Sequence, residues 1–421
     1  MDALLAGLIF AAVYALIATE RLDKTLAALL GGTVVVLLGI VSQESAFEAI
    51  DLNVIFLLAG MMILAGILRR TGFFQWLAIR SVRIAAGEPY RLLIVLSVVS
   101  ALISAFLDNV TTVVLLAPVT LYIAGVLRVS PVPFLISEIL ASNIGGTATL
   151  IGDPPNILIG SAAGLGFVEF LLNLGPVAVL ILIAFLFATR FLFKGDLEVQ
   201  GDVRAGVLAL DAREVLTDIP LLRWSLGVIG LTILGFVFAV PLGLETGTIA
   251  LFGATLLTVI SRVDVATVLE EIEWPTLFFF IGLFMLVSAI VEVGIIDALA
   301  EFLIDLTGGD ATVTSIGLLW LSAIASAIVD NIPYTTTMIP VVERLGASGI
   351  PIEPLWWALA LGACLGGNAT IVGASANVVG ANLAGRAGHP IGFATFFRYG
   401  FLVALLSIVI ATAYLYVRYL W

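Results

Sequence analysis

Apolar runs about as long as a lipid bilayer is thick dominate this sequence of 421 residues. A helix needs about 20 apolar residues to cross the hydrocarbon core. The composition leaves no soluble alternative, because 61% of the residues are hydrophobic and 11% are charged, too few polar side chains to coat a core in water. The sequence therefore predicts an all-α polytopic membrane protein. Ten crossings are expected near residues 3–19, 25–42, 52–69, 131–164, 173–193, 224–243, 246–261, 275–291, 354–385 and 399–419.

Four apolar stretches are interrupted midway by polar residues, glycine or proline. Residues 131–164 and 354–385 are long enough to cross and are predicted to be discontinuous helices. Residues 91–127 and 313–342 are predicted to be re-entrant hairpins, which enter and leave on the same side. The aromatic runs near 278–280 and 356–357 are expected to face lipid or the membrane interface as anchors.

The distribution of basic residues supports this topology. All of the 18 lysines and arginines except Arg344 and Arg418 fall on one face, and counting either hairpin as a crossing destroys the asymmetry. The positive-inside rule makes that face cytoplasmic. We therefore expect a multi-pass protein of the plasma (inner) membrane with both termini outside.

The two halves of the chain repeat each other. SALISAFLDN (100–109) matches SAIASAIVDN (322–331) at an offset of 222, and GGTATLIGDPPN (145–156) matches GGNATIVGASAN (366–377) at an offset of 221. Each half holds five crossings, an odd number, so the second repeat is expected to be inverted relative to the first. Inverted repeats with broken helices are typical of secondary transporters. The predicted organisation is a first repeat 1–195, a cytoplasmic linker 196–222 and a second repeat 223–421.

Few partners and cofactors fit this chain. No GxxxxGK[ST] motif occurs, so energy is expected from an ion gradient or from a separate cytoplasmic ATPase subunit. Besides a coupling proton or sodium ion no cofactor is expected, and one cysteine and one histidine predict no metal site. The net charge of −12 argues against nucleic acid, which leaves the lipid bilayer and a small inorganic solute as partners.

Three acids lie deep in apolar surroundings: Asp108, Asp330 and Asp153. A charge at a helix centre costs about 2.5–3.5 kcal/mol to insert, so such residues are by default functional. Asp108 and Asp330 are expected at the hairpin tips, where half-helices end and leave backbone groups free to hold ions. All three are candidates for carrying the coupling proton or ion, while the alternative for each is a helix N-cap.

Neutral polar residues and glycines surround these acids at the tips and at the two breaks. Unwound backbone at that depth is tolerated only where it packs in protein or lines a wet cavity. Neither tip nor break contains Lys or Arg, which suits a neutral oxyacid or a cation better than a bare dianion such as citrate. Substrate ligands are expected among Asn109, Thr111, Thr112, Asn143, Gly145, Gly146, Thr147, Thr149, Asn156, Asn331, Thr335, Gly366, Gly367, Asn368, Thr370 and Asn377.

At these motifs the chain resembles the ion transporter superfamily over nearly its whole length. FLDNVTT (106–112) with ASNIGGTATLIGDPPN (141–156) is similar to the group that joins ArsB-type arsenite permeases and the melanosomal P protein. NhaD-type sodium/proton antiporters resemble it through the Asp-Asn hairpin and the Gly-Asp break. The resemblance implies an elevator-type carrier, in which hairpins and broken helices move against a scaffold of spans 1–3 and 6–8, often as a homodimer.

The leading hypothesis is a non-enzymatic secondary transporter that exports arsenite or antimonite in exchange for protons. A sodium/proton antiporter and a P-protein-like transporter of inorganic or organic anions are the alternatives, with a passive channel more remote. An intramembrane aspartyl protease would need two adjacent acids and a Gly-x-Gly-Asp motif, whereas residues 150–153 read Leu-Ile-Gly-Asp.

Overall fold

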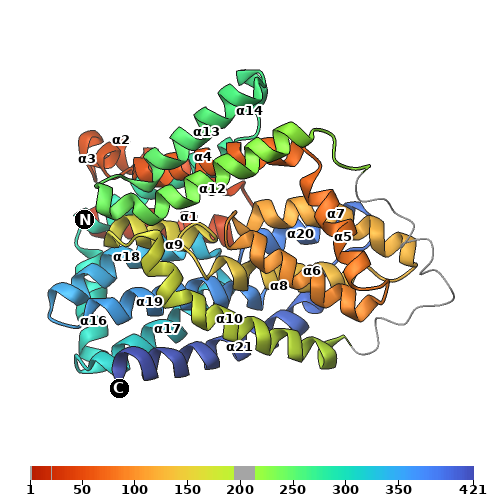
Figure 1. Ribbon diagram of the computed structural model, residues 1–421. Helices are drawn as coiled ribbons and strands as arrows, with labels where there is room; N and C mark the ends of the chain where they lie inside the picture. Colours follow the sequence, from red (N-terminus) through yellow and green to blue (C-terminus); the bar gives the residue numbers. More distant parts are fainter. Residues whose placement is uncertain (1, 20, 194–213) are drawn as a thin grey trace.

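The protein is helical throughout the part of the chain that the computed structural model describes, residues 2–19, 21–193 and 214–421 (Figure 1). Those ranges hold no β-strand. Most of the predicted 196–222 linker lies outside them. Seven helical segments within them are long and apolar enough to cross a membrane: Gln43–Arg70, Asn109–Leu127, Phe167–Leu192, Ile219–Leu242, Trp274–Glu292, Ala311–Ile328 and Phe393–Leu420. These seven apolar helices, in described ranges that hold no strand, confirm an all-α polytopic membrane protein.

The helices follow the predicted apolar stretches closely. In the first half they are α1 (Asp2–Ala18), α2 (Lys24–Leu37), α3 (Gln43–Glu48), α4 (Leu52–Arg70), α5 (Phe73–Ile84), α6 (Pro89–Ser104), α7 (Asn109–Leu127), α8 (Val132–Gly146), α9 (Pro154–Ala163) and α10 (Phe167–Leu192). In the second half they are α12 (Ile219–Leu242), α13 (Thr246–Ser261), α14 (Val265–Leu269), α15 (Trp274–Glu292), α16 (Ile295–Thr307), α17 (Ala311–Ile328), α18 (Asn331–Ala347), α19 (Ile352–Gly366), the 3-10 turn η1 (Gly367–Ala369), α20 (Ser375–Arg386), α21 (Phe393–Leu415) and the π-turn η2 (Tyr416–Leu420).

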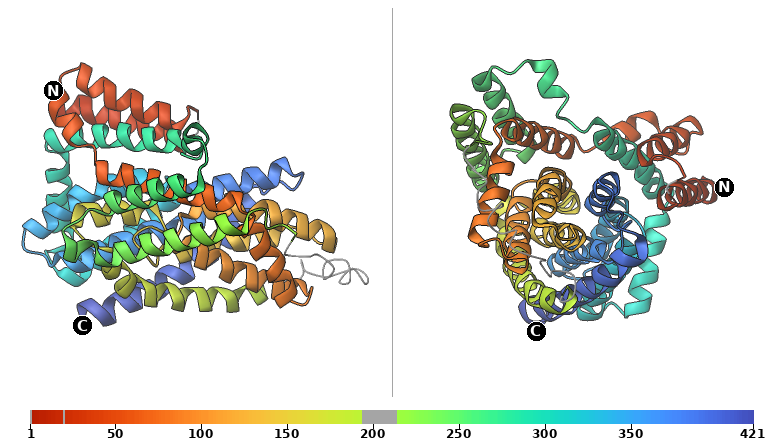
Figure 2. Two further views of the ribbon diagram at one scale, coloured as in Figure 1. Left: turned by 45° about the horizontal axis from the view of Figure 1, so that its top comes forward. Right: turned by 90° about the vertical axis from the view of Figure 1, so that its right-hand side faces the viewer.

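Seen end-on, the helices form two groups (Figure 2). A central bundle contains α5–α10 and α16–α21, with the broken helices inside it. A peripheral group of α1, α2, α4, α12, α13 and α15 lies along one side of that bundle. Both termini lie at the same end of the molecule, opposite the end that carries α5 (Figure 1).

Local sequence explains why the interrupted helices break where they do. Asp108 begins α7, with its side chain accepting from Thr111 N at 2.8 Å, and Asp330 begins α18, accepting from Ile332 N at 3.2 Å. Such carboxylate caps satisfy backbone donors that a new helix leaves unpaired. Pro154 and Pro155 start α9, where a missing N–H costs nothing. The N-cap alternative is thus real for both tip aspartates, while the re-entrant path of the hairpins stays a prediction.

The glycines before each break allow two helices to touch. A Cβ on Gly145 of α8 would collide with the backbone of Ala101 on α6, and a Cβ on Gly366 of α19 would collide with that of Ala323 on α17. Gly145 and Gly366 are matched positions of the sequence repeat, and so are Ala101 and Ala323. Corresponding residues of the two halves therefore make corresponding contacts, which explains why both halves have a glycine at this position.

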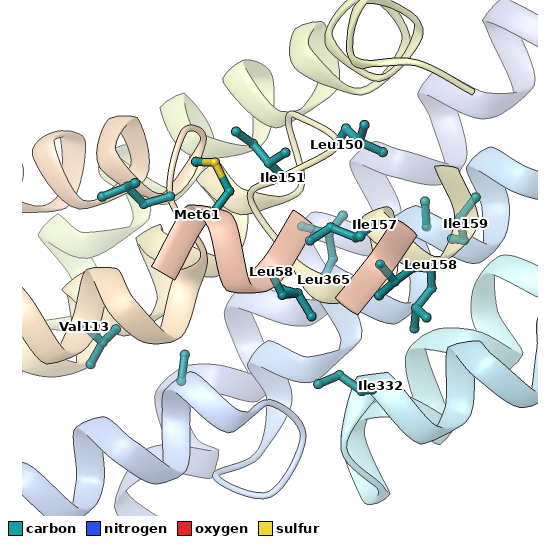
Figure 3. Packing of buried hydrophobic residues seen from close by; sticks show 14 of the residues in the cluster. Leu58, Met61, Val113, Leu150, Ile151, Ile157, Leu158, Ile159, Ile332 and Leu365 are labelled. Atoms are coloured by element: carbon teal, nitrogen blue, oxygen red, sulfur yellow. The ribbon is translucent and has the colours of Figure 1, made fainter. Parts of the chain in front are cut away.

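A shared apolar core joins the broken helices to their neighbours. Figure 3 shows members of this buried cluster from three helices: Leu58 and Met61 of α4, Ile157 and Leu158 of α9, and Ile332 of α18. The core thus runs across the boundary between the peripheral group and the central bundle. Polar tips and breaks are held inside an apolar surround, not at the surface.

The expected aromatic anchors are mostly part of this core. Phe279, Phe280, Trp356 and Trp357 are buried, and of these two runs only Phe278 is exposed. The anchor prediction is therefore wrong for four of the five rings. Their helices α15 and α19 pack on neighbours on more than one side, which composition alone does not reveal.

Candidate transport site

The tip of the first hairpin and both helix breaks meet through a chain of buried amides. Asn109 Nδ2 donates to Asn143 Oδ1 at 3.0 Å. Asn143 Nδ2 in turn donates to Asn368 Oδ1 at 2.9 Å and to Asn377 Oδ1 at 2.8 Å. All four side chains are 2% exposed or less. Residues from α7, α8, η1 and α20 are thus brought to one point, although more than 250 positions separate Asn109 from Asn368 in the sequence.

The tip of the second hairpin reaches the first break through Asp153. Asn331 Nδ2 donates to Asp153 Oδ1 at 3.2 Å, and the Asp153 side chain is fully buried. The carboxylates of Asp108 and Asp330 lie close enough to Asp153 for their charges to act on it. Asp153 therefore links the second hairpin tip to the first helix break, through the residue that follows Asp330 in the sequence.

The single thiol lies at this centre as well. Cys364 is fully buried and its Sγ donates to Asn156 Oδ1 at 3.5 Å. One thiol among amides offers no second sulfur for chelation, so Cys364 acts here as a small side chain in the packing.

Two of the predicted ligands hold the unwound segments in place. Asn156 Nδ2 donates to Thr149 O at 2.8 Å and to Thr147 O at 3.2 Å. Its counterpart Asn377 Nδ2 donates to Thr370 O at 2.7 Å and to Gly367 O at 2.8 Å. Each amide replaces hydrogen bonds that the broken helix can no longer make. Asn156 and Asn377 therefore stabilise the unwound segments at the two breaks.

The predicted threonine ligands have already committed their hydroxyl protons. Thr111 Oγ1 donates to Asp108 Oδ2 at 2.5 Å, and the other five donate to backbone carbonyls. Those five are Thr112 to Asp108 O, Thr147 to Asn143 O, Thr149 to Ala105 O, Thr335 to Asn331 O and Thr370 to Ala327 O. In this conformation they can offer a solute acceptor lone pairs but no free donor.

The centre contains buried side-chain oxygens that accept no hydrogen bond from the protein. Among the side-chain atoms that the structure describes, Asn109 Oδ1 and Asp153 Oδ2 are buried without a hydrogen-bond partner, as is Ser104 Oγ nearby in sequence. Leaving a buried polar atom unpaired costs about 1–3 kcal/mol. Two oxygens that only accept call for a ligand that donates O–H groups or carries positive charge.

The site is not free of basic residues, contrary to the expectation from its motifs. Lys24, the first residue of α2, places Nζ 3.0 Å from Asp330 Oδ2 and 2.6 Å from Ser375 Oγ. Ser375 Oγ also contacts Asp330 Oδ2, at 2.7 Å. Lys24 lies outside both tips and both breaks, so nothing local in the sequence connects it with Asp330.

Two further carboxylates near the site escaped the sequence analysis. Glu138 of α8 is 1% exposed, and its Oε1 accepts from Thr120 Oγ1 at 2.5 Å. The signal available in the sequence is an acid in the apolar run that precedes the first break. Glu273, just before α15, is exposed, and partial desolvation, followed by the Asp108 charge, raises the pKa of Glu273 above its usual value.

Sequence comparison places the chain among known transporters. The profile of a family described as citrate transporters, CitMHS, matches residues 14–362. An uncharacterized transporter of Mycobacterium bovis is 47% identical over 98% of this chain and 97% of its own length. The human P protein is 35% identical over 99% of this chain and 60% of its own length. The expected similarity to the P protein is therefore confirmed.

The fold also has solved counterparts. The crystal structure of the Alcanivorax borkumensis YdaH transporter matches with a TM-score of 0.64 at 16% identity, covering 99% of this chain and 98% of that one. Neisseria gonorrhoeae MtrF, described as one of a class of antimetabolite efflux pumps, gives 0.64 at 14% identity over 92% and 84%. At such identities the likeness concerns the fold alone. The matched profile and the full-length relatives show that this chain belongs to the citrate transporter family (CitMHS) of membrane transporters.

Proposed function

We propose that this family member exports arsenite or antimonite, as the neutral hydroxide, in exchange for protons. The observation that carries the proposal is the pair of buried, unpartnered acceptors, Asn109 Oδ1 and Asp153 Oδ2. Arsenous acid carries three O–H groups and no charge, so it can donate to acceptors of this kind without bringing a negative charge near Asp153. The further arsenite ligands are expected among the residues predicted from the sequence.

A citrate-like anion fits this centre less well, although the family takes its description from citrate. Ionised carboxylates bring further acceptors where Asn109 Oδ1 and Asp153 Oδ2 already lack a donor, and Asp153 is itself a carboxylate. Like charges that close disfavour one another. Lys24 supplies one compensating charge, and it already contacts Asp330.

Asp153 is the strongest candidate for carrying the exchanged proton in this conformation. Both oxygens of Asp108 accept from Thr111, and Asp330 accepts from Ile332, Ser375 and Lys24. Asp153 keeps one oxygen without a partner. The matching position in the second half is Ala374, so the break does not need an acid to fold.

The two groups of helices suggest how the site moves across the membrane, by motion of one group relative to the other. We propose that the central bundle carries the site past the peripheral group in the elevator manner, with the second repeat inverted relative to the first. In this proposal the chain works as a homodimer in the plasma membrane, with both termini outside and the linker in the cytoplasm. The separation of the groups in Figure 2 supports it.

A sodium/proton antiporter is the second candidate, favoured by the same two oxygens. Amide and carboxylate oxygens are ligands for a hard cation such as sodium as well as acceptors for O–H donors. The two functions differ in what moves together with the protons.

Uptake of radiolabelled arsenite into inside-out vesicles tests the proposal, with and without an imposed proton gradient. We expect gradient-dependent uptake by the wild type and its loss in Asp153→Asn, which keeps the size of the side chain. Asp153→Ala copies the other half and controls for folding. Sodium-driven proton movement without arsenite uptake would replace the proposal with antiport, and uptake of labelled citrate alone would overturn both.

A further inference from the structure

An ion pair joins the two groups of helices at the second hairpin. Lys24 begins α2 in the peripheral group, whereas Asp330 begins α18 and Ser375 begins α20 in the central bundle. The ammonium lies 3.0 Å from Asp330 Oδ2 and 2.6 Å from Ser375 Oγ, and it also lies 5.1 Å from the ring centroid of Phe279. The Asp330 side chain is 9% exposed and that of Lys24 is 33% exposed.

This position has the properties of a monovalent-cation site. A carboxylate oxygen and a hydroxyl oxygen converge on one charged nitrogen, and an aromatic face adds attraction for a cation. A cavity of about 300 Å³ borders Lys24, Asp330 and Ser375, so a small ion can reach the same oxygens. Two acids lie close to Lys24: Asp23, which caps α2 through Thr25 N, and Glu273, on which the charge of Lys24 acts.

The first half has no equivalent of this lysine. At the repeat offset of 222, Lys24 corresponds to Thr246, whose hydroxyl contacts Asn53 and not the first hairpin. Asp108, the counterpart of Asp330, accepts only from Thr111 among the hydrogen bonds that the described residues make. An internal cation therefore contacts Asp330 at the second hairpin tip, whereas no cation of the described residues hydrogen-bonds to Asp108.

We infer that Asp330 and Ser375 form a binding site for a monovalent cation, and that Lys24 fills this site in the present conformation. A bound sodium ion and the Lys24 ammonium then exclude one another. Because Lys24 belongs to the peripheral group, relative movement of the two groups withdraws it and exposes Asp330 to an ion from solution. Lys24 is thus a positioning residue that neutralises the empty site.

The role of this site in turnover rests on the proposed exchange, but its occupancy is measured without any transport. The purified full-length protein in lipid nanodiscs is titrated with radioactive sodium against a constant total of sodium and N-methylglucamine chloride. We expect weak binding in the wild type and at least tenfold tighter binding in Lys24→Met. Lys24→Arg should bind as weakly as the wild type, because it restores the charge.

Two matched variants locate the effect. Lys24→Met combined with Asp330→Asn should lose the tight sodium binding, and Arg21→Met, which removes an exposed charge from the same connection, should leave it at the wild-type level. Equal affinities of wild type and Lys24→Met would overturn the inference. So would tight binding that persists in the double variant.

A chemical rescue covers the case in which Lys24→Met does not fold. Lys24→Cys is purified and then modified with a methanethiosulfonate that adds either a positively charged aminoethyl group or a neutral methyl group. The native Cys364 is fully buried, which shields it from the reagent. The charged adduct should bind sodium weakly and the neutral adduct tightly, and identical affinities would contradict the proposal. Arsenite transport enters none of these measurements, so either hypothesis can fail alone.

Discussion

Replacing Asn143 with aspartate should destabilise the protein strongly, because this amide is the hub of the site. Its Nδ2 donates to Asn368 Oδ1 and to Asn377 Oδ1, at 2.9 and 2.8 Å. Asn143→Asp keeps the shape but puts an oxygen where two acceptors face it. Each buried acceptor left without its donor costs about 1–3 kcal/mol, so the loss is about 2–6 kcal/mol in total.

Of the two neighbours, Asn368 can adapt to the change and Asn377 cannot. Asn368 can turn its amide, since its Nδ2 makes only a 3.5 Å contact with Leu140 O. Asn377 cannot turn, because its Nδ2 holds Gly367 O and Thr370 O of the unwound segment. Turning Asn368 restores a donor to one of the two contacts, so the cost should fall in the lower part of that range, about 2–3 kcal/mol.

Titration with SDS in mixed micelles, followed by the change in helicity, measures the free energy of unfolding. Asn382→Asp is the control, because it makes the same chemical change at an exposed position of α20, the helix that carries Asn377. We expect Asn143→Asp to lose about 2–3 kcal/mol and the control to stay within about 0.5 kcal/mol of the wild type. Equal stability of the two variants would show that the hydrogen bonds donated by Asn143 do not stabilise the fold.

Two further predictions concern packing and pH. Gly145→Ala and Gly366→Ala should each lower the melting temperature, because a Cβ at either site meets backbone, although alanine normally stabilises a helix by about 1 kcal/mol relative to glycine. Gly227→Ala is the control, since nothing lies within 4 Å of a Cβ there, and it should not lower the melting temperature. A raised melting temperature in Gly145→Ala and Gly366→Ala would contradict the close helix contacts. Partial desolvation and the Asp108 charge raise the pKa of Glu273 above 4.5, so ionising it costs folding free energy and stability should fall slightly as the pH rises above that value. The effect should be small because Glu273 is exposed and solvent screens its charge. Glu273→Gln should flatten this part of the stability curve, and an unchanged curve would speak against the shift.

The sequence alone is enough to locate the breaks and the three acids. Gly-Gly pairs, the double proline and the Asp-Asn dipeptides are local signals, and they act locally: Asp108 caps α7 and Pro154 starts α9. Their meeting point was inferred from the repeat. The amide chain through Asn143 agrees with the inference that both breaks contribute to one centre.

What could not be predicted depends on contacts between distant helices. Lys24 lies 306 positions from Asp330, and no motif surrounds it. The burial of Phe279 and Trp357 likewise depends on which helices pack against α15 and α19. Residue type shows that a side chain is basic or apolar, but the three-dimensional register of the helices decides what it contacts.

Arsenite/proton exchange through Asp153 is tested by recording proton movement and arsenite movement together in one preparation of proteoliposomes. A trapped pH-sensitive dye reports protons while labelled arsenite is counted, for the wild type and for Asp153→Asn. We expect that arsenite added on one side drives protons in the opposite direction in the wild type, and that both fluxes vanish in Asp153→Asn. Arsenite movement that leaves the dye unchanged, or coupled fluxes that survive in Asp153→Asn, would contradict it.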